Sequence, residues 1–147
     1  MITAVDTSVL LDVFGDDAEF GRRSADALRR CIAEGSLLAC DIVWAETGAW
    51  FPDAKGAEDA LSKLRVAYSP LVAATALAAG RAWQAYRKVG GTRERVVADF
   101  LIGAHAATQA DRLLTRDRGF YRSYFAGLPI VDPSNEPKRR QTGRAAT

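Results

Sequence analysis

The sequence predicts a single α/β domain built on a mostly parallel sheet. Short apolar runs alternate with longer helical stretches along most of the 147 residues, a pattern typical of parallel strands joined by helices. A chain of this length is close to the usual size of one domain and can bury a sizeable core. Its composition, 48% hydrophobic and 26% charged, is ordinary for a globular protein and excludes a disordered or disulfide-scaffold class.

Five short apolar runs are predicted to be strands. The first is a β-branched run that stops at Asp6, as expected of a buried strand. The predicted strands lie at residues 2–5, 37–40, 66–68, 112–115 and 130–131.

The segments between these runs are predicted to be helical. Thr7 or Ser8 is expected to cap the first helix, which continues through Phe14, and Asp41 to cap the third. Gly35 is expected to end the second helix. The other helices are predicted at residues 18–33, 42–51, 54–65, 73–88 and 95–110, with a turn or short helix at 120–125.

The charge distribution divides the chain into a domain at residues 1–132 and a basic tail at 133–147. The tail is polar, interrupted by proline and carries four basic residues against Glu136, so it is expected to be disordered. Two further basic clusters, at residues 81–95 and 112–122, are either phosphate-binding surfaces or solvated helix faces.

The sequence also carries expectations about the compartment. No apolar run approaches the length of about 18 residues that spans a membrane. The first residues have no basic segment and soon reach Asp6, so no signal peptide is expected. Cys31 and Cys40 have no histidine beside them, which favours two reduced thiols in the cytoplasm over a zinc site.

Four acidic residues occupy apolar surroundings that solvation does not explain. Asp6 ends the first strand and Asp117 follows the fourth, while Glu46 and Asp99 lie within apolar helices. Acidic side chains are rarely buried unless they are paired or bind a metal ion.

These acids are expected to converge, because the carboxyl ends of parallel strands share one edge of a sheet. Carboxylates gathered there repel one another unless a cation neutralises them. Oxygen ligands favour Mg²⁺, or Mn²⁺ as a substitute, over zinc. Such an ion suits phosphodiester hydrolysis, because it activates water and stabilises charge on the phosphate.

At these acids the sequence resembles the PIN-domain nucleases. Residues 2–10, 44–46, 98–106 and 113–121 match the four acidic motifs of that family in order and spacing, over about residues 1–132. The small size is similar to the VapC-type toxins of type II toxin–antitoxin systems. The resemblance implies a five-stranded parallel sheet with helices on both faces. It also implies Mg²⁺-dependent ribonuclease activity, a homodimer and a cognate antitoxin protein.

The resemblance also assigns roles to residues. Asp6, Glu46, Asp99 and Asp117 become the catalytic, metal-binding acids, and Thr115 a neighbouring ligand or orienting residue. Thr7 and Ser8 are most simply helix caps, although either hydroxyl can reach the metal shell.

Two sets of residues are expected to contact macromolecules. Arginines beside the acids are expected to hold the RNA backbone, namely Arg93, Arg95, Arg116 and Arg118. Apolar residues that follow Asp6 and Glu46 are expected to leave a groove for the antitoxin, drawn from Val9, Leu10, Val13, Phe14, Trp44, Trp50 and Phe51.

The remaining polar residues have structural interpretations. His105, the only histidine, is expected to be structural, and Asp111 to lie in a turn. Trp83, like the other tryptophans, is expected to pack in the core or an interface. A solvated rim is expected to contain Asp12, Asp16, Asp17 and Glu19.

Other functions remain open. A housekeeping RNA-processing nuclease is the main alternative, and a non-catalytic PIN-like binding module should lack at least one of the acids. A haloacid-dehalogenase-like phosphatase needs a second aspartate where the chain has Ser8. No glycine-rich nucleotide-binding motif is present.

Overall fold

The computed structural model describes residues 1–91 and 97–135. Its centre is a five-stranded parallel sheet in the order β3-β2-β1-β4-β5, which confirms the predicted α/β class. The strands are β1 Ile2–Val5, β2 Ser36–Ala39, β3 Val66–Tyr68, β4 Arg112–Leu114 and β5 Ile130–Val131.

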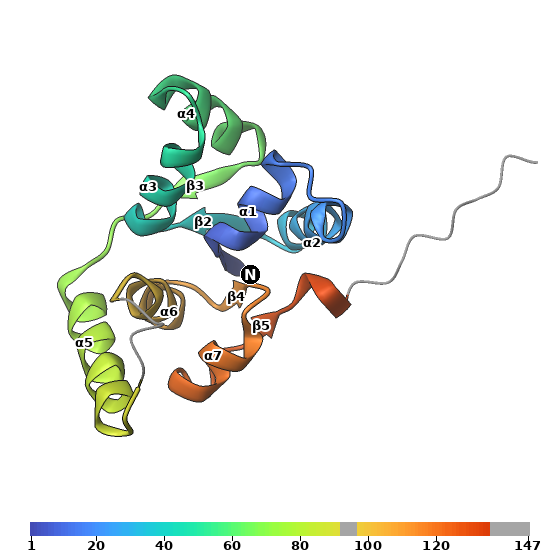
Figure 1. Cartoon of the computed structure of the whole chain (residues 1–147). Coiled ribbons are helices and arrows are strands. Elements are labelled where there is room, and N and C mark those ends of the chain that lie inside the picture. The colour runs from blue at the N-terminus through green and yellow to red at the C-terminus, as the bar shows by residue number, and fades with distance from the viewer. Residues whose placement is uncertain (92–96, 136–147) are drawn as a thin grey trace, which may run out of the picture.

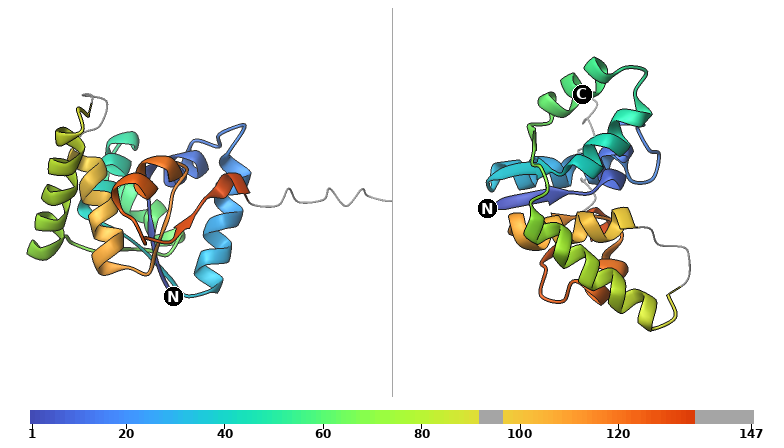
Figure 2. Two further views of the ribbon diagram at one scale, coloured as in Figure 1. Left: turned by 90° about the horizontal axis from the view of Figure 1, so that it is seen from below. Right: turned by 90° about the vertical axis from the view of Figure 1, so that its left-hand side faces the viewer.

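Helices cover both faces of this sheet (Figure 1). The helices α1 to α4 lie on one side and α5 to α7 on the other, and Figure 2 shows α5 and α6 side by side. The helices are α1 Thr7–Phe14, α2 Gly21–Ala33, α3 Asp41–Trp50, α4 Ala54–Lys63, α5 Ala73–Lys88, α6 Val97–Gln109 and α7 Arg118–Tyr124. No helix in the described ranges is long and apolar enough to cross a membrane.

The central strands are buried on both faces, as expected of a parallel sheet. Val5 and Leu114 are each at most 1% exposed and face the helices that cover the sheet. On the side of α5 to α7, the ring of Phe100 lies 5.2 Å from that of Phe120 and 5.7 Å from that of Tyr124. This aromatic packing fixes the start of α6 against α7, and both helices begin beside predicted site acids.

Two expected helix caps differ in the structure. The N-cap position of α1 is Asp6, whose side chain makes no capping hydrogen bond, and that of α3 is Cys40. Asp41 is instead the first residue of α3, and its carboxylate accepts a hydrogen bond from the Leu71 amide at 3.1 Å. Gly35 comes directly after the C-cap residue of α2, as expected of a glycine that ends a helix, and its lack of a side chain admits the Met1 carbonyl.

The folded part of the chain continues past residue 132, where the tail was expected to begin. Residues Pro133–Asn135 form a 3-10 helix, with Pro133 buried. The Arg23 side chain on α2 donates a hydrogen bond to the Ser134 carbonyl at 3.2 Å. The basic residues of the expected tail lie outside the described residues.

Candidate active site

The site begins where the neighbouring strands β1 and β4 end. The Asp6 amide donates to the Leu114 carbonyl at 3.0 Å, and the Thr115 amide donates to the Val131 carbonyl at 3.0 Å. These bonds continue the sheet ladder by one residue and place Asp6 and Thr115 at the same edge. The Thr115 hydroxyl then donates to Oδ2 of Asp6 at 2.7 Å.

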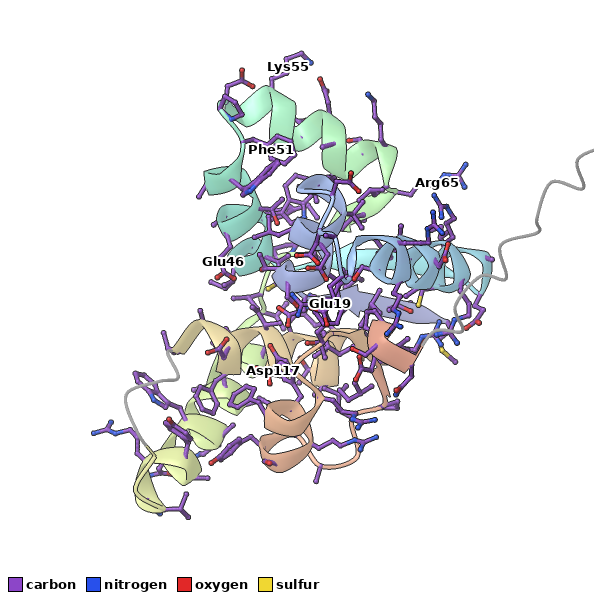
Figure 3. All side chains as sticks on the ribbon, turned by 45° about the vertical axis from the view of Figure 1, so that its right-hand side comes forward. Glu19, Glu46, Phe51, Lys55, Arg65 and Asp117 are labelled. Atoms are coloured by element: carbon purple, nitrogen blue, oxygen red, sulfur yellow. The ribbon has the colours of Figure 1, made fainter. Side chains whose placement is uncertain are left out.

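All four predicted acids line one cavity of about 410 Å³ at this edge. They come from the end of β1, from α3, from the first turn of α6 and from the start of α7. Figure 3 labels Glu46, on α3, and Asp117, at the start of α7. The lining residues are Asp6, Thr7, Ser8, Glu46, Asp99, Ile102, Arg116 and Asp117.

Hydroxyl groups connect the acids to one another. Oγ1 of Thr115, which is fully buried, donates to Asp6 and accepts a hydrogen bond from the Asp117 amide at 3.0 Å. The Thr7 hydroxyl donates to Oε1 of Glu46 at 2.9 Å. The buried Ser8 hydroxyl has no hydrogen-bond partner among the described residues. Thr115 is therefore hydrogen-bonded to Asp6, and Thr7, which was expected to be a cap, is hydrogen-bonded to Glu46.

Burial makes the ionised form of Asp6 unfavourable. Asp6 is 8% exposed, and this burial raises its pKa from 3.8 to about 6. Hydrogen bonds from the Thr115 hydroxyl and the Thr7 amide lower the pKa, whereas the carboxylates of Asp99 and Glu46 raise it. The cavity is therefore a place where a cation would stabilise the ionised carboxylates.

The carboxylates that line the cavity suit a hard divalent cation that needs only a few ligands from the protein. Every titratable ligand in the lining is a carboxylate, which favours Mg²⁺ or Mn²⁺. Within residues 1–91 and 97–135, no three acidic, histidine or cysteine side chains form a ready ligand set. Mg²⁺ commonly binds through one or two carboxylates and keeps several waters, so it does not require such a set.

The predicted phosphate-binding arginines have different environments. Arg116 lines the cavity, and its Nε and Nη2 atoms donate to the two carboxylate oxygens of Asp12 at 2.7 and 3.0 Å. Nε of Arg118 lies 4.0 Å from Asp132. Arg93 and Arg95 lie outside the described residues.

Asp12 does not belong to a solvated rim, and that prediction is wrong for this residue. It is only 5% exposed, whereas Asp16, Asp17 and Glu19 are exposed. A signal for this burial was present, because Asp12 follows the buried residue Val9 by three positions on a helix. The ion pair with Arg116 compensates for the burial of its charge.

The histidine, Asp111 and two of the three tryptophans make contacts within the fold. His105 is 1% exposed, and its Nε2 atom forms a hydrogen bond with the Ser69 hydroxyl at 2.9 Å. Burial lowers its pKa. The Asp111 carboxylate accepts a hydrogen bond from the Ile2 amide at 2.6 Å. Trp44 and Trp83 pack against the core, whereas Trp50 is 48% exposed.

Comparisons with known proteins agree with this architecture. The sequence model of one protein family, described as PIN domain, matches residues 3–126. No curated protein sequence matches the chain.

Solved structures share the fold at low sequence identity. One is a chain from the structure of VapBC2 from Rickettsia felis bound to a promoter DNA fragment. It has 17% sequence identity and a TM-score of 0.71, and the match covers 90% of this chain and 98% of that one. A chain of FitAcB from Neisseria gonorrhoeae has 20% sequence identity and a TM-score of 0.67, and the match covers 92% of this chain and 100% of that one. A toxin–antitoxin complex from Klebsiella pneumoniae gives 23% identity and a TM-score of 0.63, over 89% and 97%.

Proposed function

Because the chain belongs to the PIN domain family, we propose that it is a Mg²⁺-dependent endoribonuclease and the toxin of a toxin–antitoxin module. PIN domains are generally nucleases. The observation that carries the proposal is the convergence of Asp6, Glu46, Asp99 and Asp117 on one cavity, in which Asp6 resists ionisation. The toxin assignment is supported by the similar fold of a chain in the toxin–antitoxin complex from Klebsiella pneumoniae.

In this proposal the acids hold the metal ion and the arginines hold the RNA. A bound Mg²⁺ supplies an activated water and stabilises charge on the phosphate. Thr115 keeps Asp6 in one orientation, and Thr7 does the same for Glu46. Arg116 offers charge to the RNA backbone at the cavity, with Arg93, Arg95 and Arg118 as further candidates.

We expect RNA cleavage to require a divalent ion bound at this cavity. Calorimetric titration should detect Mg²⁺ or Mn²⁺ binding to the wild type and much weaker binding to Asp99→Asn. Asp59→Asn, which changes an exposed acid on α4 paired with Lys55, is the matched control and should bind metal normally. Equal binding by Asp99→Asn, or cleavage at the full rate in EDTA, would show that this mechanism is wrong.

The toxin assignment predicts an antitoxin that occludes the site. Val9 and Leu10 are fully buried and cannot contact it. Beside them, the rings of Phe14 and Phe51 lie 5.2 Å apart and those of Trp50 and Phe51 5.1 Å apart. Phe51 directly follows α3, on which Glu46 lies (Figure 3), so an amphipathic helix or extended peptide seated on this aromatic group can extend toward the acids.

Co-expression with the product of the neighbouring gene tests this occlusion. The inhibitor should remove toxicity and slow hydrogen exchange at residues 9–14 and 42–51. Trp50→Ala should weaken inhibition, whereas Leu77→Ala, which changes a 73% exposed residue on α5, should not. Protection confined to other surfaces contradicts the occlusion model. Harmless expression of an active wild type favours the housekeeping RNA-processing nuclease instead.

The proposal also includes a homodimer in the cytoplasm. Sedimentation of the purified chain tests the dimer, and fractionation of cells tests the compartment. A non-catalytic binding module is less consistent with the site, because all four acids are present around the cavity.

A further inference from the structure

Arg116, which lines the cavity, is held by residues of α1, α2 and the segment between them. Asp12 on α1 accepts hydrogen bonds from its Nε and Nη2 atoms at 2.7 and 3.0 Å. The Ser24 hydroxyl on α2 donates to Oδ2 of the same aspartate at 2.8 Å. The guanidinium carbon of Arg116 lies 4.2 Å from the centre of the Phe20 ring.

The burial of these groups makes the arrangement rigid. Asp12 is 5% exposed and Ser24 is fully buried, whereas the Arg116 side chain keeps 31% of its surface exposed. A buried carboxylate has lost its hydrating water, and only hydrogen bonds from its protein partners compensate for that loss. Asp12 therefore holds the arginine strongly. The planar guanidinium is fixed by two parallel hydrogen bonds and by the aromatic ring.

This arrangement leaves Arg116 able to bind an anion. Arginine has more N–H donors than the pair with Asp12 uses. The residue also lines the cavity together with Asp6, Asp99 and Asp117. Arginine is well suited to phosphate because its donors match the phosphate oxygens.

We propose that Asp12 is a positioning residue of the nuclease, which holds Arg116 in place to bind a phosphate of the RNA at the cavity. This inference rests on the proposed function. A long side chain that is already ordered loses less conformational entropy when it binds its ligand. The buried pair supplies that order without Asp12 touching the substrate.

The experiment is a double-mutant cycle on cleavage of a labelled single-stranded RNA of mixed sequence. Asp12→Asn and Arg116→Gln are each expected to lower kcat/KM by about 10- to 100-fold, since a small misplacement of a binding group has effects of that size. If Asp12 acts through Arg116, the double variant is no worse than Arg116→Gln alone. Mg²⁺ affinity, measured by calorimetry, is expected to stay within about twofold of the wild type.

A control variant tests whether the loss of another ion pair near β4 also lowers activity. Glu34→Gln breaks the ion pair with Arg112, which has the same 2.7 Å length and lies at the other end of β4. It is expected to leave kcat/KM unchanged. If Asp12→Asn fails to fold, Ser24→Ala removes one partner of Asp12 and provides a milder variant.

Nuclear magnetic resonance gives a readout that does not depend on cleavage. The Nε–H signal of Arg116, identified by its absence from Arg116→Gln, is expected to shift in Asp12→Asn or Ser24→Ala and to stay in place in Glu34→Gln. Two results would overturn the positioning role of Asp12 but not the proposed function: an unchanged kcat/KM in a folded Asp12→Asn, or additive effects of the two substitutions in the cycle. A folded wild type that neither binds nor cleaves RNA overturns the proposed function as well.

Discussion

Asp99→Asn is expected to reduce RNA cleavage by at least about a thousandfold while the protein stays folded. A metal ion contributes several kcal/mol of transition-state stabilisation, and each 1.36 kcal/mol is about a tenfold change in rate. Asp99 lies in the first turn of α6 and lines the cavity. Its carboxylate is also one of the charges that raise the pKa of Asp6. Asparagine keeps the shape of the side chain but removes the charge that the metal ion needs.

The measurement is initial-rate cleavage of labelled RNA in Mg²⁺, together with circular dichroism to establish folding. Asp59→Asn is the control, because it removes an exposed acid on α4 that does not line the cavity. Asp99→Asn with a rate close to that of the wild type would exclude this residue from the metal site. A loss of the circular dichroism signal would assign the effect to folding instead.

The sequence predicted that the four acids converge, because they follow predictable elements. Asp6 comes directly after β1, so its place at the carboxyl edge follows once that strand is recognised. Asp99 stands in a helix that is apolar on nearly every face, which makes a buried or metal-binding role the simplest explanation. Local patterns of this kind carry positional information even without a structure.

The contacts between distant residues could not be predicted in the same way. Asp12 and Arg116 are 104 positions apart in the sequence, and many other acids and arginines could have paired with either of them. The hydrogen bond from Thr7 to Glu46 likewise depends on how α1 and α3 pack together. The helix caps differed by one residue because the local preferences of Asp6, Thr7 and Ser8 are similar.

Asp6→Asn is expected to stabilise the metal-free protein at pH 7 by up to about 3 kcal/mol. The folded protein raises the pKa of Asp6 from 3.8 to about 6, so the folded state favours the protonated carboxyl. Below about pH 3 the residue is protonated in both states and has no effect. As the pH rises toward about 6, the unfolded state loses this proton more readily, and the stability of the wild type falls. Above that range the penalty is constant, at about 1.36 kcal/mol for each unit of pKa shift.

Urea unfolding in EDTA between about pH 3 and pH 7 measures this effect. The two proteins are expected to have similar stability at about pH 3 and to diverge as the pH rises, because asparagine carries no charge and its carbonyl can still accept the Thr115 hydrogen bond. Asp59→Asn should follow the wild type at every pH, since its carboxylate is exposed. Addition of Mg²⁺ at pH 7 is expected to stabilise the wild type and to have little effect on Asp6→Asn. A stability difference that does not change with pH would show that the ionisation of Asp6 is not what destabilises the metal-free site.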